Sequence, residues 1–119
     1  MGQLNNGFTI ESHFTGKAPI VRAIYDQVLQ RLARYGAIIE DPKKTSIHLV
    51  AKTALVGVAT RKDYLILTLK SARALKSPRI HKSERTSANR FHHELKLKTP
   101  AEVDDELFAW LKEAYDLSV

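Results

Sequence analysis

The 119-residue sequence is basic: 19 lysines and arginines against 13 aspartates and glutamates give a net charge of +6. The absence of cysteine excludes a disulfide framework, a thiolate zinc site and a cysteine nucleophile. No apolar run reaches the roughly 18 residues of a membrane span, and the first residues do not resemble a signal peptide. We therefore expect one cytoplasmic domain over residues 1–119, with no membrane partner.

Residues 1–9 form a polar lead-in, and the first expected regular element is a helix that begins near Pro19. Proline suits the first helical position, because the N–H that it lacks has no intrahelical partner there. Apolar residues then recur at every fourth position, as expected of a helix lying on a core: Ile20, Ile24, Val28 and Leu32. Gly36 is expected to end this helix.

Three short apolar runs follow, over residues 46–51, 54–60 and 64–70. The breaks between them are so short that consecutive runs must pair as antiparallel neighbours. The middle run has no polar face, which favours a central position. A short strand over residues 37–40 and an alternating strand over 91–98 would extend this meander to four or five strands.

The apolar pattern disappears over residues 71–89, where bases recur and Glu84 is the single acid. We predict a long basic loop here, since long segments without periodicity are usually functional or disordered. Its lysines and arginines would neutralise phosphates. The alternative is a solvated loop whose charge is balanced by the acidic last helix.

The last predicted helix begins after Thr99-Pro100-Ala101-Glu102, a capping box with proline at the first helical position. Acidic residues follow at the positive end of the helix dipole, and capping explains them better than acid–base chemistry: Asp104, Asp105 and Glu106. The elements together predict a two-layer α+β domain. An antiparallel sheet of four or five strands is covered by an N-terminal and a C-terminal helix.

The sequence contains no motif that specifies catalysis, a metal or a nucleotide. His92 and His93 raise the question of a metal site together with His13, His48 or His81. Adjacent strand residues point to opposite faces, so this pair would not share one ion. A zinc-protease motif, a serine triad order and a phosphate-cradling glycine loop are all missing. We therefore expect no catalytic residue, no metal and no cofactor, and an enzyme is not favoured.

Several short motifs occur in a fixed order along nearly the whole chain, from about Ile10 to Tyr115. They are His13-Phe14-x-Gly16-Lys17, Pro42-Lys43-Lys44, Arg90-Phe91-x-His93, Val103-Asp104 and Trp110-Leu111-x-x-Ala114-Tyr115. This order resembles domain of unknown function family 5655, and the helix–meander–helix layout is similar to YjbR/MmcQ-like and YdhG-like domains. The resemblance implies a compact accessory module, for which the family supplies no established reaction or cofactor, and in which His13 and His93 are motif residues of unassigned role.

The charge and the resemblance lead to one prediction and one alternative. We predict a binding module for an anionic partner, either nucleic acid or a phosphate-bearing ligand. The expected contacts are cations on a shared rim of the sheet and in the basic loop: Lys17, Lys43, Lys44, Arg79, Arg85 and Arg90. The alternative is a protein-interaction module that forms a homodimer through an apolar outer sheet face containing Val50, Ile66 and one side of residues 54–60.

Overall fold

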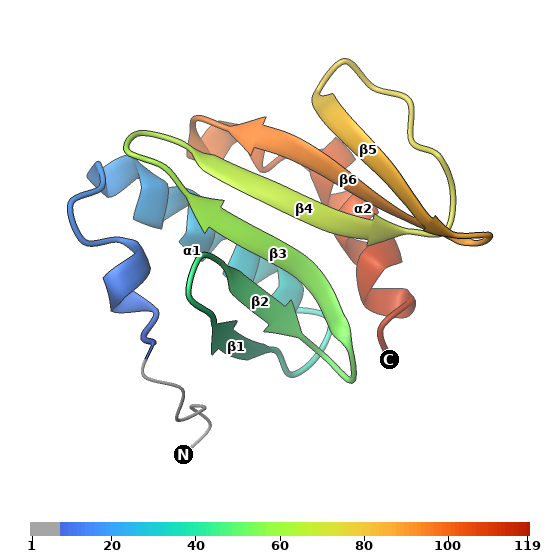
Figure 1. The fold of residues 1–119 in the computed structure, drawn as a ribbon, viewed down its shortest axis with the longest axis horizontal. Helices are drawn as coiled ribbons and strands as arrows, with labels where there is room; N and C mark the ends of the chain where they lie inside the picture. Colours follow the sequence, from blue (N-terminus) through green and yellow to red (C-terminus); the bar gives the residue numbers. More distant parts are fainter. Residues whose placement is uncertain (1–7) are drawn as a thin grey trace.

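A computed structural model describes residues 8–119 of the chain. Its two α-helices pack on one face of a six-stranded antiparallel sheet, and no described helix covers the other face (Figure 1). The predicted two-layer α+β architecture is confirmed, with six strands in place of four or five. Residues 1–7 of the predicted polar lead-in lie outside the described residues.

The strands follow the order β1-β2-β3-β4-β6-β5 across the sheet, so β5 is the one strand out of sequence order. Their bounds are β1 (Ile39–Pro42), β2 (Ile47–Val50), β3 (Ala54–Thr60), β4 (Leu65–Ser71), β5 (Ile80–Ser87) and β6 (Arg90–Leu97). The meander β2–β4 forms where the sequence predicted it. β1 begins two residues later than expected and includes Pro42, which an edge strand tolerates.

The predicted basic loop over residues 71–89 is wrong in its second half, because residues 80–87 form the edge strand β5. β5 pairs antiparallel with β6. Residues 81–87 are exposed on both faces, so no alternation of apolar and polar residues marks the strand. Residues 72–79 are an irregular crossover that carries the chain from β4 past β6 to the edge of the sheet.

The core lies between the sheet and the helices α1 (Pro19–Ala33) and α2 (Asp105–Asp116). Alternate residues of the strands are buried against it: Ile47, Leu49, Val56, Val58, Leu65, Leu67, Leu69, Leu95 and Leu97. Each buried aliphatic side chain contributes about 1.5–3 kcal/mol relative to an exposed one. The apolar stripe of α1 is confirmed except at Ile20, which is 37% exposed while Val21 is buried. None of the helices in residues 8–119 is long and apolar enough to cross a bilayer.

Both helices have ends that differ from the prediction. α1 begins at Pro19 but ends at Ala33, so Gly36 is not its cap. Gly36 instead packs against the Tyr115 side chain, whose hydroxyl would have to move to make room for a Cβ at this position. The capping box at Thr99 starts the short 3-10 helix η2 (Pro100–Glu102), whereas α2 is capped by Asp104, whose carboxylate accepts the N–H of Leu107 at 3.2 Å.

Candidate functional site

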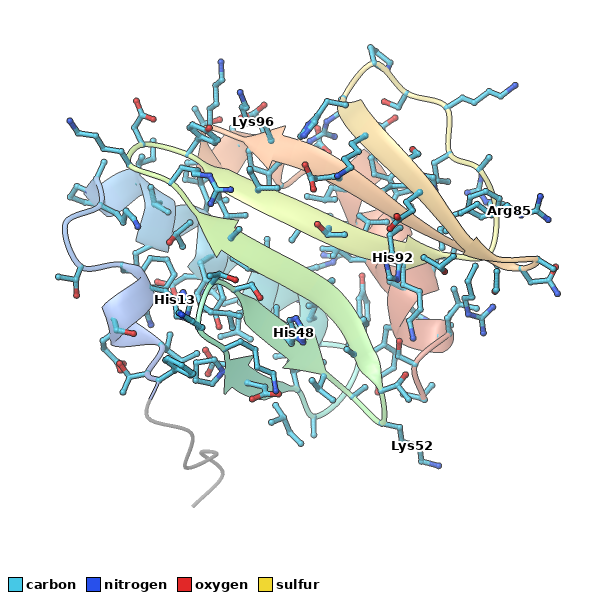
Figure 2. All side chains as sticks on the ribbon, viewed as in Figure 1. His13, His48, Lys52, Arg85, His92 and Lys96 are labelled. Carbon is cyan, nitrogen blue, oxygen red and sulfur yellow. The ribbon has the colours of Figure 1, made fainter. Side chains whose placement is uncertain are left out.

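The face of the sheet opposite the helices, called here the open face, carries a continuous row of mainly polar residues. The cross-strand register aligns one residue from every strand: Asp41, His48, Gly57, Thr68, Glu94 and Lys82. The strand neighbours Leu49, Leu67 and Leu95 are buried against the helices. Because successive side chains point to opposite faces, the row lies on the open face, where Figure 2 shows His48, His92 and Lys96.

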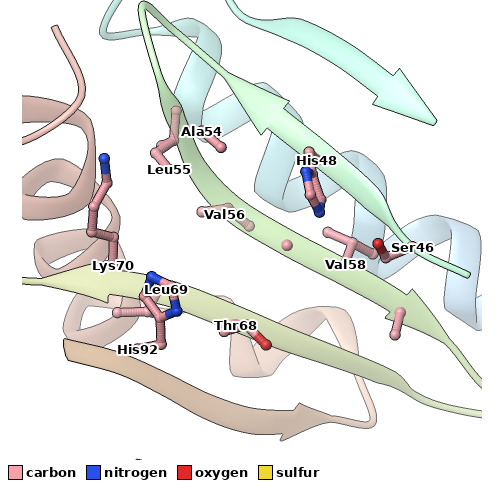
Figure 3. Close-up of a pocket in the computed structure, with 12 residues that line it drawn as sticks. Ser46, His48, Ala54, Leu55, Val56, Val58, Thr68, Leu69, Lys70 and His92 are labelled. Carbon is pink, nitrogen blue, oxygen red and sulfur yellow. The ribbon is translucent and has the colours of Figure 1, made fainter. Parts of the chain in front are cut away.

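A hollow of about 290 Å³ lies in this face, over the central strand β3 (Figure 3). Gly57 forms its floor without a side chain. His48 from β2 and His92 from β6 stand on opposite sides of it, and Thr68 and Lys70 of β4, a strand that lies between these two, also line it. This volume is at the lower end of the range for ligand pockets, about 300–1,000 Å³, so the hollow suits a small group.

Gly57 keeps the hollow open without being needed for the fold. Its backbone does not adopt a positive φ; among residues 8–119 only Gly16 does so. A Cβ at Gly57 would meet Thr68 at 3.8 Å, an ordinary van der Waals distance. Glycine inside a strand weakens it and often marks the close approach of a ligand. The effect of glycine at this position is therefore to leave space above β3.

Two cations at one end of the hollow lack a carboxylate partner among the described residues. Lys70 Nζ donates to Thr53 Oγ1 at 3.1 Å, and Arg90 Nη1 donates to the carbonyl of Asn89 at 2.9 Å. Arg90 precedes His92 by two residues and so shares its face. Partial burial, and then repulsion by Arg90, lower the pKa of Lys70. A bound anion would relieve this repulsion.

The structure does not bring the predicted cations together on one rim. Lys17, Lys43 and Lys44 lie at the end of the sheet that holds the β1–β2 and β3–β4 turns. Arg90 lies at the opposite end, where β6 starts beside the last residue of β4. The predicted shared rim is therefore wrong. Lys43 also has a partner of its own, the carboxylate of Asp41 at 2.9 Å.

Arg79 and Arg85, the other predicted cations, contact the protein itself. Arg79 donates to Asp104 at 2.8 Å and to Glu106 at 3.1 Å, and only 22% of its side chain is exposed. These bonds hold the crossover against the start of α2, which agrees with the alternative of a loop balanced by the acidic helix. Arg85 lies over the ring of Phe91, 5.8 Å from its centroid, and donates to two carbonyls of the β5–β6 turn.

The motif histidines His13 and His93 are held by protein groups. His93 is fully buried on the helix side of β6. Its Nδ1 lies 2.7 Å from Ser83 Oγ, and its Nε2 lies 3.0 Å from the carbonyl of Arg73 and 3.3 Å from the nitrogen of Leu75. It therefore ties both the crossover and β5 to β6. His13 Nε2 lies 2.8 Å from a carbonyl of the β1–β2 turn.

The histidines that line the hollow are His48 and His92. From the sequence they were considered only as candidate metal ligands, and no metal site was expected. No hydrogen bond joins either ring to another residue of the described part of the chain. His92 points away from His93, as the strand alternation predicted. Residues 8–119 contain no group of three or more histidine, aspartate and glutamate side chains placed to hold a metal ion. The alternation of residues 46–52 was the sequence signal that could have placed His48 on this face.

Comparison with known proteins gives one match. The model of a family described as a domain of unknown function (DUF5655) matches residues 10–118, a range that includes every helix and strand of the structure. No curated protein and no solved structure matches the chain.

Proposed function

The chain belongs to the DUF5655 family, a domain of unknown function, and we propose that it is a non-enzymatic module that binds nucleic acid through phosphates on the open face. The observation that carries this proposal is the pair Lys70 and Arg90. The two cations repel each other on a face that no described helix covers, and neither has a carboxylate partner among residues 8–119. The net charge of +6 attracts a polyanion to the protein.

Further cations extend this site along the outer strands. Lys82 of β5 belongs to the polar row, and Lys96 of β6 lies two residues beyond Glu94 on the same face. Neither lysine forms an ion pair within residues 8–119. The carboxylate of Glu94 is engaged by His81 at 2.7 Å. A line of separated cations suits the repeating phosphates of a nucleic acid strand better than a single small anion.

Arg90 is the member of the predicted cation set that this proposal retains. Lys44 is an exposed cation at the opposite end of the sheet and is left out of the site. Arg79 is left out because its guanidinium is bonded to α2. The proposed site therefore consists of Lys70 and Arg90, with Lys82 and Lys96 as outer contacts.

Self-association through the same face is the alternative predicted from the sequence. Among its expected apolar contacts, Val50, Ile66 and Ala59 are half-buried and Leu55 is buried. The exposed large apolar side chains among residues 8–119 are Ile20, Ile39 and Val119, and of these only Ile39 is on the sheet. The apolar area available to a second copy is small, so we expect a monomer in light scattering at micromolar concentration.

The test is fluorescence anisotropy of short labelled RNA and DNA strands over a range of salt concentrations. We expect binding whose logarithm falls linearly with the logarithm of salt concentration. The double variant Lys70→Ala/Arg90→Ala should bind weakly, and its salt slope should be smaller by roughly 0.7 for each phosphate that the variant no longer neutralises.

The matched control is Lys17→Ala/Lys44→Ala, which removes the same charge from the other end of the sheet. It should keep nearly the wild-type affinity for a short strand. Equal losses in the two double variants would mean that only net charge matters. No association with any strand at about 50 mM salt would contradict the proposal.

A further inference from the structure

We infer that the hollow over Gly57 receives one unpaired base of the bound strand, so that the module prefers single-stranded to double-stranded nucleic acid. This inference rests on the proposed function, because it specifies which form of nucleic acid the open face takes. Its basis is the juxtaposition of the hollow, two imidazole rings and the unpaired cations on one face.

The shape of the hollow fits a flat, small group. The strand backbone is bare at Gly57, and the neighbouring open-face residue of β3, Ala59, adds only a methyl group. A planar ring can therefore approach the sheet more closely here than over a strand with ordinary side chains. Neither backbone geometry nor packing demands this glycine, so the close approach of a ligand is the role left for it.

The lining of the hollow has the chemistry that recognises bases. Histidine is among the aromatic side chains on which unstacked bases stack, and His48 and His92 flank the hollow from opposite sides (Figure 3). The hydroxyls of Ser46 and Thr68 also line it. Neither hydroxyl is hydrogen-bonded to another residue of the part of the chain that the structure describes. Both are therefore ready to donate to or accept from a base edge.

The cations lie where a base in the hollow would place its phosphate. Lys70 lines the hollow itself, and Arg90 lies beyond it on the same face. A base in a duplex is stacked and paired, and would have to leave the helix to reach the floor of the hollow. The hollow therefore selects single strands, while the cations attract any nucleic acid.

The deciding variant is Gly57→Val, which fills the hollow without removing a charge. Valine favours a strand, so thermal unfolding should show a midpoint equal to or higher than that of the wild type. For the wild type, we expect a short single strand to bind roughly 5- to 100-fold more tightly than a duplex of the same sequence. In Gly57→Val this preference should be lost, while the affinity for the duplex stays unchanged.

Three further measurements keep the test independent of that one variant. A strand with abasic sites retains the phosphates, and its affinity for the wild type should fall to that of the duplex. The variant His48→Ala/His92→Ala, altered only at side chains that face the hollow, should also lose the preference for single strands. Gly57→Ala adds only one carbon, so it should lose less of the preference for single strands than Gly57→Val does.

The outcomes separate this inference from the proposed function. If no oligonucleotide binds in a salt-dependent way, the proposed function itself is wrong. If single, abasic and double strands bind alike and Gly57→Val changes nothing, the function stands and the base-binding hollow is overturned. If Gly57→Val instead turns a dimer into a monomer in light scattering, the hollow holds a side chain of a second copy, and the inference is again overturned.

Discussion

Two histidines that are neighbours in β6 show how differently the two faces of the sheet are used. His93 is buried beneath the helix layer and lies within hydrogen-bonding distance of three polar groups. His92 is exposed on the open face beside the hollow. The pleat of the strand alone separates them. Packing explains the helix-covered face. On the open face, neither backbone geometry nor packing requires Gly57, and the Lys70 ammonium donates to one protein group, the Thr53 hydroxyl.

The largest expected effect on the free energy of unfolding comes from alanine substitution of adjacent residues of β4 that point to opposite faces. Leu67 is fully buried, so Leu67→Ala should lower the free energy of unfolding by about 2–5 kcal/mol. Thr68→Ala, on the open face, should change it by only about 0.5 kcal/mol. Urea denaturation measures both. Equal losses would show that the open face is also part of a packed core.

The same exchange at the two histidines should separate stability from binding. His93→Leu removes the bonds to Ser83 and the crossover and should cost about 1–3 kcal/mol of unfolding free energy. His92→Leu should leave stability within about 0.5 kcal/mol of the wild type but weaken binding of a single strand. If His93→Leu, measured on the folded protein, weakens binding as much as His92→Leu does, binding is not specific to the open face.

Asp104, unlike the charges of the open face, stabilises the fold. Asp104 caps α2 and accepts from Arg79, so Asp104→Ala should cost about 1 kcal/mol. Burial alone would raise the pKa of Asp104, but the Arg79 guanidinium and the Leu107 N–H lower it below its ordinary value. Because its pKa is lower when folded, its contribution is present at neutral pH and is lost as the pH falls through the folded value.

Denaturation of the wild type and Asp104→Ala should therefore differ at pH 7, and the difference should begin to shrink only when the pH falls below about 4, the ordinary pKa of an aspartate. The matched control is Asp105→Ala, which removes a carboxylate that forms no ion pair within residues 8–119. At pH 7 it should lower the free energy of unfolding by less than Asp104→Ala does. Oligonucleotide binding at neutral pH should be unchanged in both variants, since neither aspartate lies on the open face.

The smallest expected effect is a gain of affinity. Glu84 is the register partner of His92 and brings a negative charge to the edge of the open face. Glu84→Gln should tighten oligonucleotide binding roughly two- to fivefold, the range expected for one exposed charge, without changing the free energy of unfolding. Weaker binding by this variant, measured by anisotropy at low salt, would place the strand elsewhere.

The two faces also explain what could be predicted from the sequence. The meander and both helices were predictable because each buries one side, which leaves an apolar period in the sequence. β5 escaped prediction because residues 81–87 are exposed on both sides. The sequence indicated the acidic last helix as a possible partner of the basic segment. It could not specify that Arg79 bonds to Asp104 and Glu106, because they follow it by more than twenty residues.

The prediction of a shared rim was wrong because of the number of strands between its cations. Turns of an antiparallel sheet alternate between its two ends. β2, β3 and β4 run between the β1–β2 turn and the start of β6, so Lys43 and Arg90 lie at opposite ends. The hollow could not be predicted, because an empty space above Gly57 depends on cross-strand neighbours that the sequence does not specify.

Whether the open face binds the ligand is tested residue by residue by a nitrogen–proton NMR titration with a short single strand. We predict that shifted amides cluster at residues of β2, β3, β4 and β6 around the hollow, including His48, Gly57, Lys70 and His92. The amides of α1, α2 and the β1–β2 turn with Lys44 should remain in place. Shifts confined to the helices or to that turn would contradict the account.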